Sequence, residues 1–161
     1  MLNPDIFRAY DIRGIASKDI DERGAYSIGR AFSVFLKERN DVGKYQSMVV
    51  TSDARESSPL LKKGLSQGLL DEGIDVIDGG FTTTPMHYFA INHIKASGGI
   101  MVTASHSPPA YNGFKLSLEG ALPVGQDSGL EEVKRIALRN IFHESHVKGK
   151  IIKYDFLKCT Q

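Results

Sequence analysis

The chain alternates short apolar runs with longer segments of helical periodicity, and this alternation constrains its fold more than any other feature. Apolar runs typical of buried strands cover residues 48–50 and 99–103, and strand-like runs cover residues 74–77, 114–118 and 150–154. Apolar residues recur at helical spacing over residues 21–39, 57–72, 85–94 and 128–142. Because helices that alternate with buried strands cover the faces of a largely parallel sheet, we expect an α/β fold, a layered α/β/α domain with a mixed, mainly parallel sheet.

Proline and hydroxyl residues predict where two of these helices begin. Ser57 or Ser58 precedes Pro59, and Thr84 precedes Pro85, as expected for a capping side chain followed by proline in the first turn. The inner face of the second helix is expected to hold Leu60, Leu61, Leu65 and Leu69. The last helix is expected to bury Leu130, Val133, Ile136, Ala137 and Ile141.

Composition limits the possible partners. A chain of 161 residues suits one domain with its own core, and 41% hydrophobic with 24% charged residues is typical of a globular protein. The net charge of +1 gives no general attraction to nucleic acid or to an anionic membrane, so we expect neither as a partner. The single cysteine, Cys159, excludes an internal disulfide and a cysteine metal cluster. The N-terminus does not resemble a signal peptide, and we expect a cytoplasmic protein.

The run from Thr103 to Lys115 is the chemically densest part of the chain. Ser105 follows a buried strand directly, on a loop stiffened by Pro108 and Pro109, and the Asn112-Gly113 pair is expected to form a turn. A hydroxyl presented at the carboxyl end of a strand suits nucleophilic chemistry, although a serine in such a loop is more often only a turn residue.

Three loops should meet at the carboxyl edge of the sheet, at residues 51–58, 78–84 and 104–113. They bring hydroxyls, Arg55 and two helix N-termini together, which is a setting for phosphate. Ser105 could hydrogen-bond a phosphate there or carry a phosphoryl group, and the residues alone do not separate these roles. Arg8 and Arg13 could bind an oxyanion or lie on a solvated edge segment.

The histidines suggest other sites that we disfavour. A serine hydrolase would need a base near Ser105, but adjacent residues such as His106 point elsewhere in an extended segment, and no G-x-S-x-G motif is present. His143 and His146 lack a third metal ligand nearby, which favours a solvated helix end. His87 and His93 are expected to be structural or surface residues.

Four motifs resemble those of the α-D-phosphohexomutase family, which includes phosphomannomutase and phosphoglucomutase, and they occur in that family's order. They are F-R-x-Y-D-I-R-G at 7–14, T-S-D-A-R at 51–55, T-T-P at 83–85 and T-A-S-H-S-P-P-A-Y-N-G-F-K at 103–115. The resemblance covers nearly the whole chain and implies the family's first domain. It assigns residues 1–150 to that domain and 151–161 to the start of a connection to a second one.

The resemblance implies a catalytic role for Ser105, which would carry a phosphoryl group and exchange it with a hexose phosphate through a hexose 1,6-bisphosphate. It assigns Arg13 and Lys115 to assisting the transfer, with Tyr10, His106 and Asn112 as supporting residues. Arg8 and Arg55, suggested above by their charge and position, remain candidates for supporting the phosphate. It also implies Mg2+ bound through the phosphoryl group on Ser105, with other ligands in a second domain. A loose phosphoryl transition state is stabilised mainly by such positioned cations.

The chain departs from the family pattern in two ways. Ser107 stands where the family usually has Asn, and Ala110 stands where an acidic residue is common. The D-G-D-G-D metal loop, the sugar-specificity loop and the C-terminal phosphate loop of the family's domains II to IV do not occur in the 161 residues. We therefore expect no mutase turnover from this chain alone. A stand-alone, non-catalytic phosphosugar-binding or regulatory module is the alternative.

Overall fold

The computed structural model describes residues 2–39, 47–143, 145–156 and 158, and Cys159 lies outside this part of the chain. The strands are β1 (Ile12–Ile15), β2 (Ser47–Ser52), β3 (Asp75–Phe81), β4 (Gly98–Val102), β5 (Tyr111–Leu118) and β6 (Ile151–Lys153). The helices are α1 (Glu22–Arg39), α2 (Ser58–Asp71), α3 (Thr84–Ile94) and α4 (Leu130–Arg139). Short 3-10 turns cover Pro4–Ile6, Glu119–Ala121 and Gln126–Ser128.

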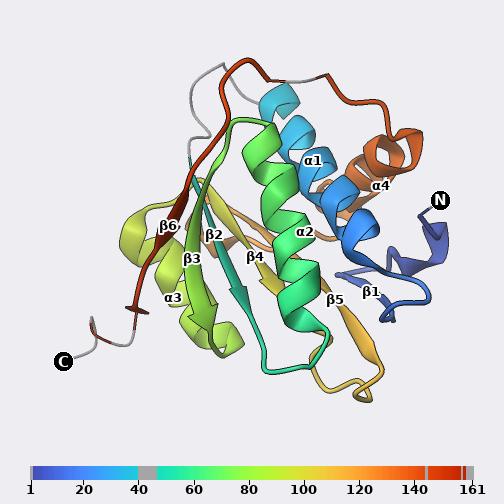
Figure 1. Cartoon of the computed structure of the whole chain (residues 1–161), viewed down its shortest axis with the longest axis horizontal. Helices are drawn as coiled ribbons and strands as arrows, with labels where there is room; N and C mark the ends of the chain where they lie inside the picture. The colour runs from blue at the N-terminus through green and yellow to red at the C-terminus, as the bar shows by residue number, and fades with distance from the viewer. Residues whose placement is uncertain (1, 40–46, 144, 157, 159–161) are drawn as a thin grey trace.

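The six strands form one mixed sheet with the order β1-β5-β4-β2-β3-β6 (Figure 1). The pairs β4–β2, β2–β3 and β3–β6 are parallel, whereas β5 runs antiparallel to both β4 and β1. The expected α/β/α domain with a mixed, mainly parallel sheet is thus confirmed. Because β5 returns beside β4, the loop that carries Ser105 closes a hairpin at the carboxyl end of β4.

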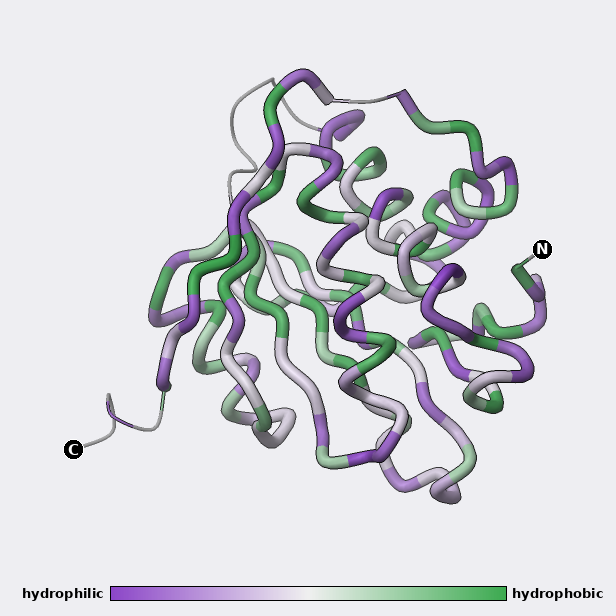
Figure 2. Tube along the Cα trace, in the orientation of Figure 1, coloured by the Kyte–Doolittle hydropathy of each residue, from purple (hydrophilic) through white to green (hydrophobic). Residues whose placement is uncertain are grey.

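Helices cover the sheet from both sides. The helices α1 and α2 lie on one face with α4 packed against α1, and α3 lies on the other face (Figure 1). Alternate residues of a strand point to opposite faces, so Met48 and Val50 of β2 belong to the larger core under α1 and α2, and Val49 belongs to the smaller core under α3. Hydrophobic colour accordingly runs along the central strands, whereas it alternates with polar colour on the helices (Figure 2).

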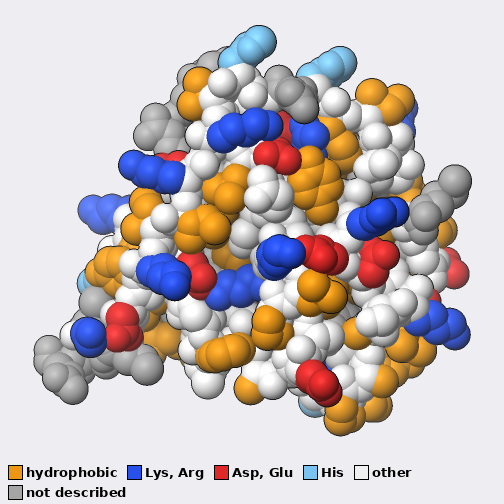
Figure 3. Space-filling view, in the orientation of Figure 1, with side chains coloured by type: hydrophobic (Ala, Val, Ile, Leu, Met, Phe, Trp, Pro, Cys, Tyr) orange, Lys and Arg blue, Asp and Glu red, His pale blue; other side chains and the backbone are white. Residues whose placement is uncertain are grey.

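The helices α1 and α2 approach so closely that main-chain atoms touch. A Cβ atom on Gly29 would stand 2.4 Å from the Leu65 carbonyl oxygen, and one on Gly68 would stand 2.3 Å from that of Tyr26. A buried carboxylate reinforces the contact, because Glu72 pairs with both Arg30 and Lys37 at 2.7 Å. The outer face of this helix layer carries intermixed basic and acidic side chains (Figure 3). None of the described helices is long and apolar enough to cross a membrane.

Five details differ from the sequence-based expectations. Ser57 precedes α2 at the capping position, but its side chain makes no capping hydrogen bond. Thr83 rather than Thr84 caps α3, since its side chain accepts from the Met86 N–H. Leu60 was expected on the inner face of α2 but is 49% exposed, because that helix turns it away from the sheet. The helix α4 already ends at Arg139, which leaves Ile141 exposed. The Asn112-Gly113 pair forms no turn and lies inside β5 instead.

The strand β6 lies beyond residue 150 and extends the same sheet. It pairs in parallel with β3, placing Ile151 opposite Val76, and Phe156 after it is buried in the smaller core. Residues 151–153 therefore complete the sheet edge next to β3. That residues 151–161 lead to a second domain stays a prediction.

Candidate functional site

The carboxyl ends of β2, β3 and β4 meet at one edge of the sheet, at the bottom of Figure 1. Hydrogen bonds join two of the three expected loops directly, because Arg55 after β2 contacts the loop after β4. The third loop, after β3, is linked to β2 by the Thr82 N–H, which donates to the Ser52 carbonyl at 3.0 Å. It lines a separate hollow with residues 153–156 that does not include Ser105. The described site therefore centres on the loops after β2 and β4.

Ser105 is exposed and has an unusual main-chain conformation. Its φ of 57° lies in the left-handed region, which few residues other than glycine adopt. Its N–H donates to the Thr103 hydroxyl oxygen at 3.0 Å, and that hydroxyl donates to Asp53 at 2.7 Å. The Ser105 hydroxyl has no hydrogen bond to any described residue. Residues held in sparsely populated conformations cluster at functional sites, and this one presents a free hydroxyl to solvent.

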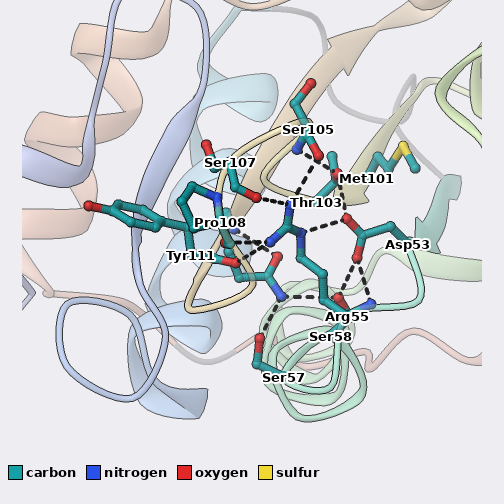
Figure 4. A network of polar contacts seen from close by, with 12 residues as sticks. Asp53, Arg55, Ser57, Ser58, Met101, Thr103, Ser105, Ser107, Pro108 and Tyr111 are labelled. Atoms are coloured by element: carbon teal, nitrogen blue, oxygen red, sulfur yellow. Dashed lines mark hydrogen bonds and ion pairs between the residues drawn. The ribbon is translucent and has the colours of Figure 1, made fainter.

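Arg55 holds the loop in this shape through all five of its N–H groups (Figure 4). Its Nε donates to Asp53 at 3.1 Å, in an ion pair. Its two terminal nitrogens donate to the carbonyl oxygens of Pro108 and Tyr111, at 2.8 and 3.0 Å, and of Ser105 and Ser107, at 3.0 and 2.7 Å. We call Arg55 with these four carbonyls the Arg55 clamp. Because Asp53 and the four carbonyls engage every donor, Arg55 supports a phosphate only indirectly here, by shaping the segment around Ser105.

Asp53 connects the clamp to the start of α2. Besides Arg55 and Thr103, it accepts a hydrogen bond from the Ser58 hydroxyl at 2.8 Å. Burial tends to raise the pKa of this carboxyl, but the hydrogen bonds from Thr103, Ser58 and the Arg55 N–H, together with the Arg55 charge, hold the pKa below its usual value. Asp53 is therefore an anion at neutral pH, which keeps it an acceptor for all of these donors.

Asn112 is fully buried and joins β5 to the first turn of α2. Its amide nitrogen donates to the hydroxyls of Ser57 and Ser58 at 2.8 and 3.0 Å. Gly113 follows it where β1 comes closest, since a Cβ atom there would stand 1.9 Å from the Ile12 carbonyl oxygen. In this arrangement Asn112 supports the site from beneath, through the scaffold.

Arg13 and Lys115 share one face of the sheet, opposite α1 and α2. In β1 and β5 their neighbours Ile12 and Phe114 point into the larger core, so the alternating residues point the other way. Arg13 Nη1 donates to the Ser107 hydroxyl at 2.9 Å, and Nη2 forms an ion pair with Asp11. Lys115 has no ion pair or hydrogen bond with any residue that the structure describes. Two cations therefore lie on the sheet beside the Ser105 loop.

The other predicted site residues lie at the surface. The side chains of Arg8, Tyr10 and His106 are exposed, and no described residue hydrogen-bonds them. Arg8 and Arg13, which the sequence pairs as one oxyanion site, share no contact that links their guanidinium groups. The structure thus gathers Ser105, Arg13, Lys115, Arg55 and Asn112 around one loop, whereas the side chains of the other three make no hydrogen bond there.

The histidines do not form a metal site. Among the described residues no group of three or more His, Cys, Asp or Glu side chains comes together, which includes the surroundings of His143 and His146. His87 on α3 is fully buried, and its Nδ1 lies 2.8 Å from the Thr51 hydroxyl. Burial lowers the pKa of His87 to about 4, so the ring is neutral at physiological pH. His87 is therefore the structural residue that its position in the sequence predicts.

Sequence reasoning missed how Ser107, Thr103 and Asp53 are used. In the sequence Ser107 is notable only as a departure from the family motif, yet its hydroxyl and its carbonyl contact two different arginines. The signal that was available is the T-S-D-A-R segment, in which an aspartate two residues before an arginine can form a local ion pair. No pattern in the sequence pairs residue 53 with residue 103.

Comparisons with known proteins identify relatives of this chain. Residues 4–144 match the family model described as phosphoglucomutase/phosphomannomutase, alpha/beta/alpha domain I. Over 151 residues the chain is 46% identical to a phosphomannomutase of Vibrio cholerae serotype O1 and 38% identical to a phosphoglucomutase of Neisseria gonorrhoeae. Each alignment covers 94% of this chain and 32% of the relative.

A solved structure of a phosphoglucomutase/phosphomannomutase family protein from Burkholderia thailandensis superposes with a TM-score of 0.87 at 34% sequence identity. The superposition covers 99% of this chain and 35% of that chain. The chain therefore spans about a third of the length of these relatives.

Proposed function

Because this chain belongs to the phosphoglucomutase/phosphomannomutase family, whose domain I it matches, we propose that it is the first domain of a phosphohexomutase. The whole enzyme would interconvert hexose 1-phosphate and hexose 6-phosphate through a phosphoserine and a 1,6-bisphosphate. Similarity to proteins named phosphomannomutase and phosphoglucomutase supports this proposal. The observation that carries it is the unpartnered Ser105 hydroxyl, presented in a left-handed conformation by the Arg55 clamp.

Ser105 is assigned the role of phosphoryl carrier. In one direction the bond between phosphorus and Ser105 Oγ breaks while a bond from phosphorus to a hydroxyl oxygen of the hexose phosphate forms. The sugar hydroxyl loses its proton and Ser105 Oγ gains one. The resulting bisphosphate then returns its other phosphoryl group to Ser105. Arg13 and Lys115 are assigned to stabilising the charge of the transferring group, because positioned cations supply most of the catalysis in such transfers.

We propose Mg2+ as the metal, with the phosphoryl group on Ser105 as the only ligand from this chain. A phosphoryl oxygen is a hard donor of the kind that Mg2+ prefers. The described side chains do not form a complete metal site by themselves. Its remaining ligands would come from elsewhere in the enzyme. When bound, the metal would supply charge neutralisation at the phosphoryl oxygens.

The remaining assignments follow from the same proposal. Tyr10, Arg8 and His106 are exposed and would contact the substrate or its phosphate, whereas Asn112 and Arg55 would act through the loop. Residues 1–150 would form domain I and residues 151–161 would begin the connection to domains II to IV. The isolated 161-residue chain would have no mutase turnover because it would supply only part of the active site, without the metal loop and the sugar-binding loops of the other domains. We place the enzyme in the cytoplasm.

Phosphorylation of Ser105 tests the proposal. The full-length gene product is incubated with glucose 1,6-bisphosphate and Mg2+, and its mass and phosphopeptides are then determined. We expect one phosphoryl group on Ser105 and none in the Ser105→Ala variant. Absence of phosphate on Ser105 would refute the role of carrier, and turnover of mannose 1-phosphate by the 161-residue chain would refute its inactivity.

The alternative, a non-catalytic phosphosugar-binding or regulatory module, draws some support from Ser107 at the position where the family usually has Asn. It predicts that the bisphosphate binds without labelling Ser105. The same experiment, with binding followed by calorimetry, separates the two functions.

A further inference from the structure

The contacts of Arg13 raise the question of what fixes its guanidinium relative to Ser105. One partner is Asp11, two residues before it in the same segment. A partner so close in sequence moves together with Arg13 and cannot hold it against another loop. The second partner is the hydroxyl of Ser107, 94 residues away in sequence and 2.9 Å from Arg13 Nη1. The buried Arg13 Nε has no partner among the described residues.

Hydrogen bonds hold the main chain of Ser107 at both its N–H and its carbonyl group. Its N–H donates to the Ala104 carbonyl at 3.0 Å, and its carbonyl accepts from Arg55 Nη2 at 2.7 Å. Only rotation about one side-chain bond is left to it. Figure 4 shows the side chains of Ser105 and Ser107 both pointing away from the Arg55 guanidinium. The loop shape that presents the Ser105 hydroxyl therefore also sets the position of the Ser107 hydroxyl.

These contacts form a continuous chain from one arginine to the other. Arg55 fixes the Ser107 main chain, and the Ser107 hydroxyl accepts a hydrogen bond from Arg13. Within the described residues this is the only polar contact from the Arg13 guanidinium to the loop that carries Ser105. A hydrogen bond from a charged donor is stronger and more directional than one between neutral groups. Loss of the Ser107 hydroxyl would leave Arg13 tied only to its own segment.

We propose that Ser107 is a positioning residue whose hydroxyl holds the Arg13 guanidinium in register with the Ser105 loop. The inference rests on the proposed function, because it assigns Arg13 to the same phosphoryl transfer. A poorly oriented cation still attracts an anionic ligand but stabilises the transition state less well. Loss of Ser107 should thus lower the rate of transfer more than the affinity for the bisphosphate.

Kinetics of the full-length gene product test this role. In Ser107→Ala we expect the rate of Ser105 phosphorylation by glucose 1,6-bisphosphate to fall about tenfold, as for loss of one charge-assisted hydrogen bond. The half-saturating concentration should change by less than about twofold. Ser107→Thr keeps a hydroxyl and should recover most of the rate. The matched control is Ser27→Ala, which removes a hydroxyl on α1 that donates to the Asn140 side chain, and it should behave as wild type.

A double-mutant cycle identifies the partner of Ser107. In the Arg13→Ala background, Ser107→Ala should lower the rate by less than about twofold further, because the contact that it removes is already lost. An equally large loss in that background would overturn the proposal, as would a wild-type rate in the single Ser107→Ala variant.

A spectroscopic measurement on the 161-residue chain separates this inference from the proposed function. The side-chain Nε–H signal of Arg13, identified by its absence in Arg13→Lys, reports the mobility of the guanidinium. We expect rotation of the group to accelerate several-fold in Ser107→Ala and to stay slow in Ser107→Thr. If wild-type Ser105 takes no phosphate, the proposed function fails, but this signal still tests whether the Ser107 hydroxyl holds the Arg13 guanidinium. An unchanged signal in a folded Ser107→Ala chain would refute the positioning role.

Discussion

Replacing Arg55 with alanine should loosen the loop that carries Ser105 and lower the free energy of unfolding of the domain. The Arg55 side chain is 14% exposed and donates five hydrogen bonds, one to a carboxylate and four to carbonyls. The bonds to the Ser105 and Pro108 carbonyls lie near solvent, so water can replace them. The remaining three are partly buried, and at about 1 kcal/mol each they predict a loss of about 3 kcal/mol in the free energy of unfolding.

Urea titration followed by circular dichroism measures this loss. With a dependence of about 2 kcal/mol per molar urea, typical for a domain of this size, the midpoint should fall by about 1.5 M. Hydrogen exchange should show lost protection for amides between residues 104 and 111. Arg55→Lys should recover less than half of the stability, because a single ammonium cannot reach four carbonyls and a carboxylate.

The matched control is Lys63→Ala, which removes a cation from α2 that is 74% exposed and pairs with Glu22. An exposed pair contributes little, and we expect a change below about 0.5 kcal/mol. If Arg55→Ala also stays within 0.5 kcal/mol of wild type and the loop amides keep their protection, the clamp does not hold the loop and the reasoning is wrong.

Three further predictions concern the scaffold. Gly113→Ala places a Cβ atom 1.9 Å from the Ile12 carbonyl oxygen and should lower the melting temperature by about 10 °C, whereas Gly80→Ala, with open space around it, should lower it by only a few degrees. His87 binds its proton near pH 4 when folded and near pH 6.5 when unfolded, so its contribution is full above pH 6.5 and is lost as the pH falls toward 4. We expect a loss of about 2–3 kcal/mol across that window, and His87→Gln should lack this part of the pH dependence in urea titrations. Glu72→Gln leaves its two buried or half-buried basic partners poorly compensated and should cost about 3 kcal/mol in the same titration, and a cost below 1 kcal/mol would contradict that account.

Local patterns predicted the elements well and their ends less well. The helical spacing over residues 21–39 is confirmed as α1. The apolar residues that recur at that spacing are all buried: Ala25, Ile28, Ala31, Phe32, Phe35 and Leu36. The predicted end of the last helix was wrong. Ile141 continues the apolar spacing, but the chain leaves α4 at Asn140, which has a left-handed conformation. Periodicity reports which residues could share a face, but the packing against neighbouring elements decides where the helix stops.

The residues of the candidate site divide in the same way. Ser105 could be singled out from the sequence because a buried strand, two prolines and a hydroxyl follow one another locally. Asn112-Gly113 was misassigned to a turn, since the need for glycine arises from the close approach of β1, which lies far away in sequence. The task of Arg55 was equally hidden, because its acceptors are main-chain carbonyls that carry no side-chain signature.

The sequence by itself determined the α/β class, the order of the helices and of every strand after β1, and the edge of the sheet where the loops meet, because hydrophobic periodicity and turn residues act over a few neighbouring positions. It did not predict β1 (Ile12–Ile15), whose residues show no clear alternation. The tertiary structure alone decided that Arg55 closes on the Ser105 loop and that Ser107 reaches Arg13. These contacts join positions 52 and 94 residues apart. Their geometry depends on the antiparallel return of β5 between β4 and β1, which no local pattern in the chain specifies.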